Sequence, residues 1–186
     1  AMQLNLPTLL TLLRIVLIPF FLMFFYLPVE WARVAATALF ALAAFTDWLD
    51  GFLARKWDQT SPFGAFLDPV ADKLMVASAL VLLVSELSNV LVAIPAIVII
   101  GREITISALR EWMAEMGNRT NVAVSIIGKV KTAAQMLAIL LLLYREPVGE
   151  FPTSVVGMVL LYVAMLLTLW SMVLYLRAAW PVLSQE

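Results

Sequence analysis

The sequence contains no cysteine and no histidine, and each absence excludes a kind of chemistry. Without cysteine the chain can form no disulfide and has no thiol nucleophile. A typical zinc site is excluded as well, because such sites draw on thiolate and imidazole ligands. Any general base that works at neutral pH must therefore be a carboxylate, a lysine, a tyrosine or a metal-bound water.

Charged residues are also scarce, at 13% of the 186 residues, whereas 63% are hydrophobic. A soluble domain carries about twice that charged fraction. The net charge is −1, which gives no electrostatic basis for binding nucleic acid. No second domain, repeat or disordered tail is indicated, so we expect one membrane domain over residues 2–186. Ala1, ahead of Met2, is expected to be an added residue.

Long apolar segments predict an all-α integral membrane protein with six transmembrane helices. A helix needs about 20 apolar residues to cross the hydrocarbon core, and residues 151–176 carry no charge at all. The first apolar run lacks a small-residue cleavage site, so we expect it to be a retained span. A short interfacial helix could precede that span, within residues 2–12. The five further spans are predicted at residues 8–28, 32–55, 64–86, 90–114 and 122–144.

The distribution of lysine and arginine predicts how these spans are oriented. Six spans place both termini on one side. With a cytoplasmic N-terminus, only Arg33 and Arg145 fall on the opposite side. The basic residues at or near the cytoplasmic face are then Arg14, Arg55, Lys56, Lys73, Arg102, Arg110, Arg119, Lys129, Lys131 and Arg177.

Four aspartates lie at helical spacing at the cytoplasmic ends of the second and third spans: Asp47, Asp50, Asp68 and Asp72. Each pair shares one helix face with small residues, which are Gly51, Ala54 and Gly64. The link between the two spans is short and contains Pro62. We therefore expect antiparallel neighbouring helices with facing stripes, where small residues let a backbone or a ligand approach closely.

Carboxylates gathered near a membrane face repel one another, at a cost on the order of several kcal/mol each when unpaired. Pairing with Arg55, Lys56 and Lys73 is one way to offset that cost, and divalent cations are another. An all-oxygen ligand set favours Mg²⁺, Mn²⁺ or Ca²⁺ over zinc or copper. A structural salt-bridge network is the alternative, but the four spacings favour a metal site.

The run from Asp47 to Asp72 resembles the signature of the CDP-alcohol phosphotransferases, which fixes residues at set spacings across these 26 positions. The similarity continues outside this run and is greatest to the bacterial phosphatidylglycerophosphate synthases of that family. It is carried by residues 5–14, 101–111 and 128–136. One departure is Thr8, where many relatives have asparagine after the proline.

The resemblance implies an enzyme of the bacterial inner membrane, active at the cytoplasmic face and expected to be a homodimer among membrane lipids. It would transfer the phosphatidyl group from CDP-diacylglycerol to sn-glycerol 3-phosphate and release CMP. Position by position it implies two Mg²⁺ or Mn²⁺ ions on Asp47, Asp50, Asp68 and Asp72, with Asp72 also as the catalytic base. The implied contacts to the CDP-lipid are Thr8, Thr11, Gly51, Ala54, Arg55, Ser61 and Gly64.

A phosphorylated acceptor needs cations near the aspartates. The candidates for binding the acceptor phosphate are Arg110, Arg119, Lys129 and Lys131. An arginine can hold a phosphate with two hydrogen bonds at once. The alternative is that these basic residues anchor the helices at lipid headgroups; the small and polar Gly128 and Thr132 favour phosphate binding for Lys129 and Lys131. Glu103 either orients one of these residues or pairs with Arg102.

Two alternative functions stay open. The first keeps the family but changes the acceptor to inositol phosphate, serine or phosphatidylglycerol; the basic residues after the fourth span favour a phosphorylated acceptor. The second is a divalent-cation transporter, since intramembrane carboxylates are common in transporters. Against it, the aspartates gather at one face instead of the midplane, and no paired broken helices are indicated. Lipid synthases that use a histidine nucleophile are excluded by composition.

Overall fold

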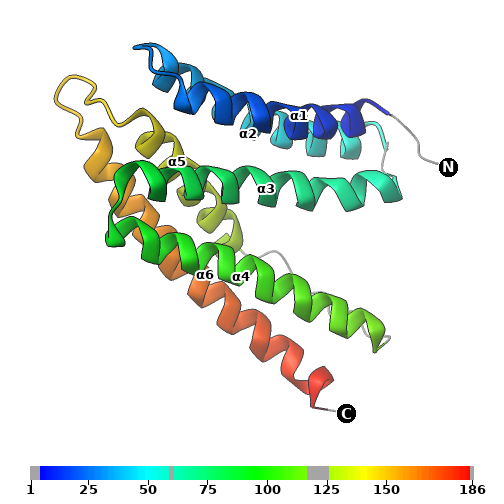
Figure 1. Ribbon diagram of the computed structural model, residues 1–186. Coiled ribbons are helices and arrows are strands. Elements are labelled where there is room, and N and C mark those ends of the chain that lie inside the picture. The colour runs from blue at the N-terminus through cyan, green and yellow to red at the C-terminus, as the bar shows by residue number, and fades with distance from the viewer. Residues whose placement is uncertain (1–4, 59–60, 117–125, 185–186) are drawn as a thin grey trace.

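A computed structural model of the protein describes residues 5–58, 61–116 and 126–184, and these ranges form a bundle of long helices (Figure 1). In chain order the helices are α1 (Leu6–Tyr26), α2 (Ala32–Lys56), α3 (Pro62–Leu87), α4 (Val90–Glu115), α5 (Ile126–Tyr144) and α6 (Thr153–Leu183). Each predicted span corresponds to one of them, so the all-α prediction is confirmed.

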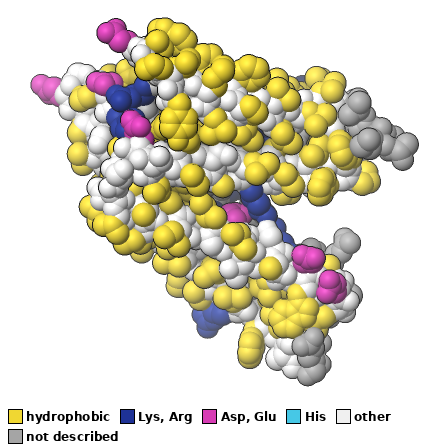
Figure 2. Space-filling model, viewed as in Figure 1, with side chains coloured by type: hydrophobic (Ala, Val, Ile, Leu, Met, Phe, Trp, Pro, Cys, Tyr) yellow, Lys and Arg dark blue, Asp and Glu magenta, His cyan; other side chains and the backbone are white. Residues whose placement is uncertain are grey.

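Four of the described helices, α1, α2, α4 and α6, are long and apolar enough to cross a membrane. Helix α3 is comparably long but carries several charged residues, whose positions are considered below. Hydrophobic side chains cover most of the visible face of the bundle (Figure 2). Such a surface suits lipid as its solvent, and the protein is a multi-pass membrane protein.

The start of α1 differs from the prediction. The sequence left open a short interfacial helix within residues 2–12, whereas in the described residues Leu6 already belongs to the first turn of a single continuous α1. The physical reason is a strong helix start, because the Asn5 side chain accepts a hydrogen bond from the Thr8 amide at 3.0 Å and Pro7 occupies the first turn. Residues 1–4 lie outside the described ranges.

The turn between α2 and α3 brings the two predicted aspartate stripes together. Helix α2 ends at Lys56, and Asp58 has a positive φ of 51°. Ser61 then caps α3, since its hydroxyl accepts a hydrogen bond from the Gly64 amide at 3.0 Å. Pro62 follows in the first turn. The chain therefore reverses within a few residues, and the end of α2 lies beside the start of α3.

The helices pack so that one end of the bundle opens. In Figure 1, α1, α2 and α3 run side by side, whereas α4 and α6 diverge from them toward the side where α1 begins and α6 ends. Helix α5 packs against α6, α2 and α3, and a buried apolar core forms around Phe40, Leu80 and Ile139.

The opposite end of the bundle is held by ion pairs. Arg33 pairs with Glu146 at 2.8 Å, and Arg145 pairs with Glu86 at 3.4 Å. These residues line one cavity with the end of α1 and the start of α2. Arg33 and Arg145 therefore share the end of the bundle remote from the aspartates, as the predicted topology requires.

Candidate active site

A buried arginine on α1 joins three of the four predicted aspartates. Arg14 is 1% exposed. Its Nη1 lies 2.6 Å from Asp47 Oδ1, and its Nη2 lies 2.7 Å from Asp50 Oδ2 and 3.5 Å from Asp68 Oδ1. The carboxylates of α2 and α3 thus face each other, as predicted, and converge on a cation supplied by a third helix.

Thr11 lies one turn before Arg14 and contacts two of these three carboxylates, those of Asp50 and Asp68. Its hydroxyl oxygen is 2.6 Å from Asp50 Oδ2, 2.6 Å from Asp68 Oδ1 and 3.1 Å from the Pro7 carbonyl. A hydroxyl has one proton to donate, so Thr11 can satisfy only one of these acceptors at a time. Arg14 Nη2 provides the further donors that the two carboxylates need.

Of the two ways to offset the charge of the aspartates that the sequence left open, pairing with Arg55, Lys56 and Lys73 is not what the structure shows, because the paired cation is Arg14. Arg55 and Lys56 are exposed, with the Lys56 ammonium 5.7 Å from the Phe52 ring centre, and Lys73 reaches across to α4. The reason is the direction of the side chains, because Arg55, Lys56 and Lys73 project from faces of α2 and α3 other than those that carry the aspartates. The sequence analysis placed Arg14 only at the cytoplasmic face. The signal that could have indicated its role is its spacing of three residues from Thr11, which puts both side chains on one helix face.

Asp72 lies apart from the arginine. It forms no hydrogen bond with Arg14 among the described residues, although both line a small space with Asp47. Asp72 also lines a second, larger cavity with Lys73, Glu103 and Gln135. Asp72 therefore stands between the carboxylate cluster and the charged residues of α4 and α5.

A small cavity of about 130 Å³ lies beside Asp68. The predicted CDP-lipid residues that line it are Thr8, Ala54, Ser61 and Gly64. A Cβ placed on Gly64 would lie 3.2 Å from both the Ser61 and Thr8 hydroxyls, so a larger residue would fill this space. Gly51 and Arg55 are neighbours on α2 but do not line the cavity.

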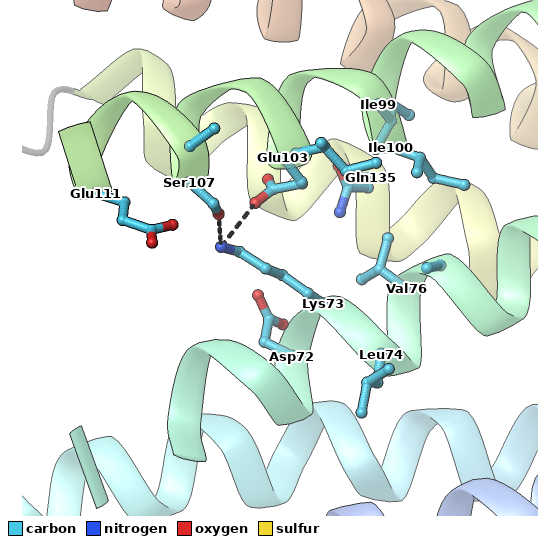
Figure 3. A pocket seen from close by; sticks show the side chains of 13 residues that line it. Asp72, Lys73, Leu74, Val76, Ile99, Ile100, Glu103, Ser107, Glu111 and Gln135 are labelled. Atoms are coloured by element: carbon cyan, nitrogen blue, oxygen red, sulfur yellow. Dashed lines mark hydrogen bonds and ion pairs between the residues drawn. The ribbon is translucent and has the colours of Figure 1, made fainter. Parts of the chain in front are cut away.

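A larger cavity of about 520 Å³ lies between α3 and α4 and is lined in part by Asp72. Lys73 reaches across it from α3 toward Ser107 and Glu103 on α4 (Figure 3). Much of the wall is apolar, formed by residues such as Ile99 and Ile104. The polar groups gather at the end near Asp72.

Glu103 is surrounded by three basic residues from three helices. Its Oε1 lies 3.2 Å from Arg102 Nη1 and 4.0 Å from Lys131 Nζ, and its Oε2 lies 3.9 Å from Lys73 Nζ. The structure thus combines the two roles that the sequence left open for Glu103. Sequence reasoning offered Arg102 as a partner of Glu103 but missed Lys73 as a member of this group, although Lys73 directly follows Asp72.

The predicted acceptor residues are only partly brought together. Lys131 is 8% exposed and faces Glu103. Lys129 is exposed, and the exposed Arg110 has its guanidinium 5.5 Å from the ring centre of Tyr175 on α6. Arg119 lies outside the described residues.

The fold and the acidic cluster define the class: a helical membrane protein with its site at one end of the bundle, between the second and third helices. The chain belongs to the CDP-alcohol phosphatidyltransferase family, whose profile matches residues 4–170. The resemblance in the sequence motifs is therefore confirmed, and the chain is a transferase.

Curated relatives match almost the whole chain. A protein of Sodalis glossinidius (strain morsitans) is 60% identical over 178 residues, which is 96% of each chain. Proteins of Shigella flexneri and Escherichia coli (strain K12) are 58% identical over 178 residues, again 96% of each chain. All three are named CDP-diacylglycerol–glycerol-3-phosphate 3-phosphatidyltransferase.

Members of this family generally depend on a divalent metal. Within residues 5–58, 61–116 and 126–184, no three acidic side chains form a ready-made metal cage; the carboxylates converge on Arg14 instead. The donor set nevertheless fits a divalent cation, because it consists of oxygen atoms alone. The contacts to Arg14 also show that the cluster attracts positive charge, and one guanidinium cannot neutralise four carboxylates.

Proposed function

We propose that the protein transfers the phosphatidyl group from CDP-diacylglycerol to sn-glycerol 3-phosphate, giving phosphatidylglycerophosphate and CMP. The observation that carries this proposal is the position of Asp68 and Asp72, one helical turn apart on α3. Asp68 lines the small cavity and Asp72 lines the large one. Donor and acceptor can then approach the carboxylate cluster through different cavities, one lined by α1, α2 and α3 and the other lined mainly by α3 and α4. The names of the relatives support this choice of substrates.

The carboxylates Asp47, Asp50, Asp68 and Asp72 would hold the metal, which we propose to be two Mg²⁺ or Mn²⁺ ions. Bound divalent cations stabilise charge on the phosphoryl oxygens of such a reaction. The chain itself contributes the placement of these ligands on two adjoining helices, the second of which starts at the Ser61 cap.

On the donor side, the small cavity is the proposed site for the CDP group. Its hydroxyl groups, from Thr8 and Ser61, are available to phosphate or ribose oxygens. Gly64 keeps the cavity open, because any side chain there would meet both hydroxyls. Gly51 and Arg55 remain predicted contacts at the outer edge of this site.

On the acceptor side, we propose that Lys73, Arg102 and Lys131 bind the phosphate of glycerol 3-phosphate, with Glu103 holding the three in place. Asp72 would accept the proton of the attacking hydroxyl. That oxygen bonds to the phosphorus of the phosphatidyl group as the bond from this phosphorus to CMP breaks. Three cations around one carboxylate leave an excess of positive charge that can bind a phosphate. Serine carries no phosphate, so a serine acceptor would not need this charge.

The orientation also remains a proposal. We place the site at the cytoplasmic face of a bacterial inner membrane, because the basic residues gather at that end of the bundle. The homodimer stays a prediction of the family resemblance.

An acceptor panel tests the proposed reaction. Purified protein with CDP-diacylglycerol and Mg²⁺ is expected to release CMP with glycerol 3-phosphate, and not with inositol phosphate, serine or phosphatidylglycerol. The measurement is CMP formed over time, with a reaction lacking acceptor as control. CMP release with another alcohol alone would replace the proposed acceptor. Metal flux into liposomes without any CMP release would favour the transporter.

Lys131→Met is expected to raise the KM for glycerol 3-phosphate by about tenfold or more, with a smaller change in kcat. Lys131 is buried beside Glu103, and a hydrogen bond to a charged group contributes roughly 1.5–3 kcal/mol. Lys129→Met is the matched comparison, since the exposed Lys129 side chain is expected to change KM by less than about twofold. Equal effects of the two substitutions on KM would contradict this assignment.

A further inference from the structure

We infer that Arg14 is a positioning residue for the metal-binding carboxylates. It holds one oxygen of each of Asp47, Asp50 and Asp68, so that the other oxygen of each is turned toward a divalent cation. The inference rests on the proposed metal-dependent function and adds to it a residue outside the aspartate motif. Arg14 is counted as a positioning residue because it contacts the proposed ligands and not the substrate.

The pattern of contacts carries the inference. Arg14 and Thr11 use only Oδ1 of Asp47, Oδ2 of Asp50 and Oδ1 of Asp68. In the part of the chain that the structure describes, the second oxygen of each carboxylate accepts no hydrogen bond from these residues. Each aspartate is thus fixed through one oxygen, which sets the direction of the other.

The burial of Arg14 also points to a specific role. The side chain is 1% exposed, and its buried Nε has no hydrogen-bond partner among the described residues. Burying an incompletely satisfied guanidinium is costly, and a purely structural anchor could be apolar. What the arginine provides is a planar fork, whose two terminal nitrogens reach carboxylates on two different helices. Its charge also offsets the mutual repulsion of the aspartates, so they stay together before a metal binds.

The competing explanation is that Arg14 only anchors α1 to α2 and α3. A second explanation is that the guanidinium occupies the cation position and competes with the metal. The three roles differ in their effect on metal affinity. Loss of a positioning residue weakens metal binding, loss of an anchor lowers stability alone, and loss of a competitor strengthens metal binding.

The experiment compares full-length wild type, Arg14→Gln and Arg14→Lys in detergent. Mn²⁺ binding is titrated without substrates, the Mg²⁺ dependence of CMP release is measured, and thermal unfolding reports folding. Arg14→Gln is expected to raise the Mn²⁺ dissociation constant and the half-saturating Mg²⁺ concentration at least about tenfold. Arg14→Lys is expected to fall between wild type and Arg14→Gln, because an ammonium keeps the charge but loses the fork.

Arg145→Gln is the matched control. Arg145 also pairs with a carboxylate, and its buried Nε also has no hydrogen-bond partner in the part of the chain that the structure describes, but it lies at the other end of the bundle. It is expected to affect unfolding and leave Mn²⁺ binding unchanged. Unchanged or tighter Mn²⁺ binding by folded Arg14→Gln overturns the inference. If Arg14→Gln does not fold, a wild-type affinity for Mn²⁺ in Arg14→Lys overturns the inference instead. No Mn²⁺ binding by the wild type would instead overturn the proposed metal role itself.

Discussion

Asp68→Asn is expected to lower kcat/KM for phosphatidyl transfer by about 10³-fold, or about 4 kcal/mol of transition-state stabilisation, without unfolding the protein. Asp68 is one of the proposed metal ligands, and an amide oxygen carries no charge to attract the cation. The fold should tolerate the change because the Asp68 side chain is 46% exposed and its contact with Arg14 is long, at 3.5 Å. The measurement is CMP release with glycerol 3-phosphate, alongside thermal unfolding.

The choice of Asp68 over Asp50 follows from their surroundings. Asp50 is 3% exposed and lies 2.7 Å from the buried Arg14. Removing that carboxylate would leave a buried cation short of a partner, which costs roughly 3–5 kcal/mol. A loss of activity in Asp50 variants could therefore reflect stability, whereas at Asp68 the two effects are separable.

Asp58→Asn is the control for Asp68→Asn. Asp58 is exposed and lies in the turn between α2 and α3, with a positive φ of 51° that asparagine also adopts readily. The same charge is removed near the site, but from outside the carboxylate cluster. Its activity is expected to stay within about twofold of wild type. Substantial turnover by Asp68→Asn, with Asp58→Asn equally active, would contradict the proposed ligand role.

The placement of the four aspartates was predictable from sequence because helical periodicity alone sets it. Spacings of three and four residues put Asp47 with Asp50, and Asp68 with Asp72, on single helix faces. The short link with Pro62 then made α2 and α3 neighbours. The prediction that the two stripes face each other held, although α1 packs against both helices and supplies the contacts that join them.

The partner of the aspartates could not be predicted in the same way. Arg14 lies 33 to 54 residues away along the chain from the aspartates that it contacts. The nearer cations, Arg55 and Lys73, were equally plausible in sequence. Which one reaches the cluster depends on how α1 is rotated against α2 and α3, and this rotation follows from the packing of whole helix faces.

The prediction of the residues that bind the acceptor phosphate was limited in the same way, because the sequence does not give the rotation of packed helices. Arg110, Lys129 and Lys131 are alike as basic residues near helix ends, but only Lys131 faces Glu103 in the described structure. Arg110 turns to Tyr175 on α6. Composition identifies such candidates, whereas the rotation of α4 and α5 decides among them.

Asp72 differs from the other three aspartates in what surrounds it, and this gives the second large prediction. The other three contact Arg14, whereas Asp72 lines the large cavity with Lys73 and Glu103. It is therefore the carboxylate best placed to meet the acceptor hydroxyl. Asp72→Asn preserves the shape of the side chain and removes its ability to take a proton. It is expected to lower kcat at least about 10²-fold, the usual scale for a lost general base.

The metal dependence of this variant separates the two roles proposed for Asp72. CMP release is measured with both substrates saturating, over a wide range of Mg²⁺ concentration. A loss that persists at saturating Mg²⁺ means that Asp72 acts on the acceptor hydroxyl, whereas recovery at high Mg²⁺ means that it acts mainly as a ligand. Glu111→Gln is the control for a general change in cavity charge, because it removes one charge from an exposed residue on the α4 wall of the same cavity. Its turnover is expected to stay within about twofold of wild type. Near-normal turnover by Asp72→Asn at every Mg²⁺ concentration would contradict both roles, and the proton would then have to leave by way of water or another carboxylate of the cluster.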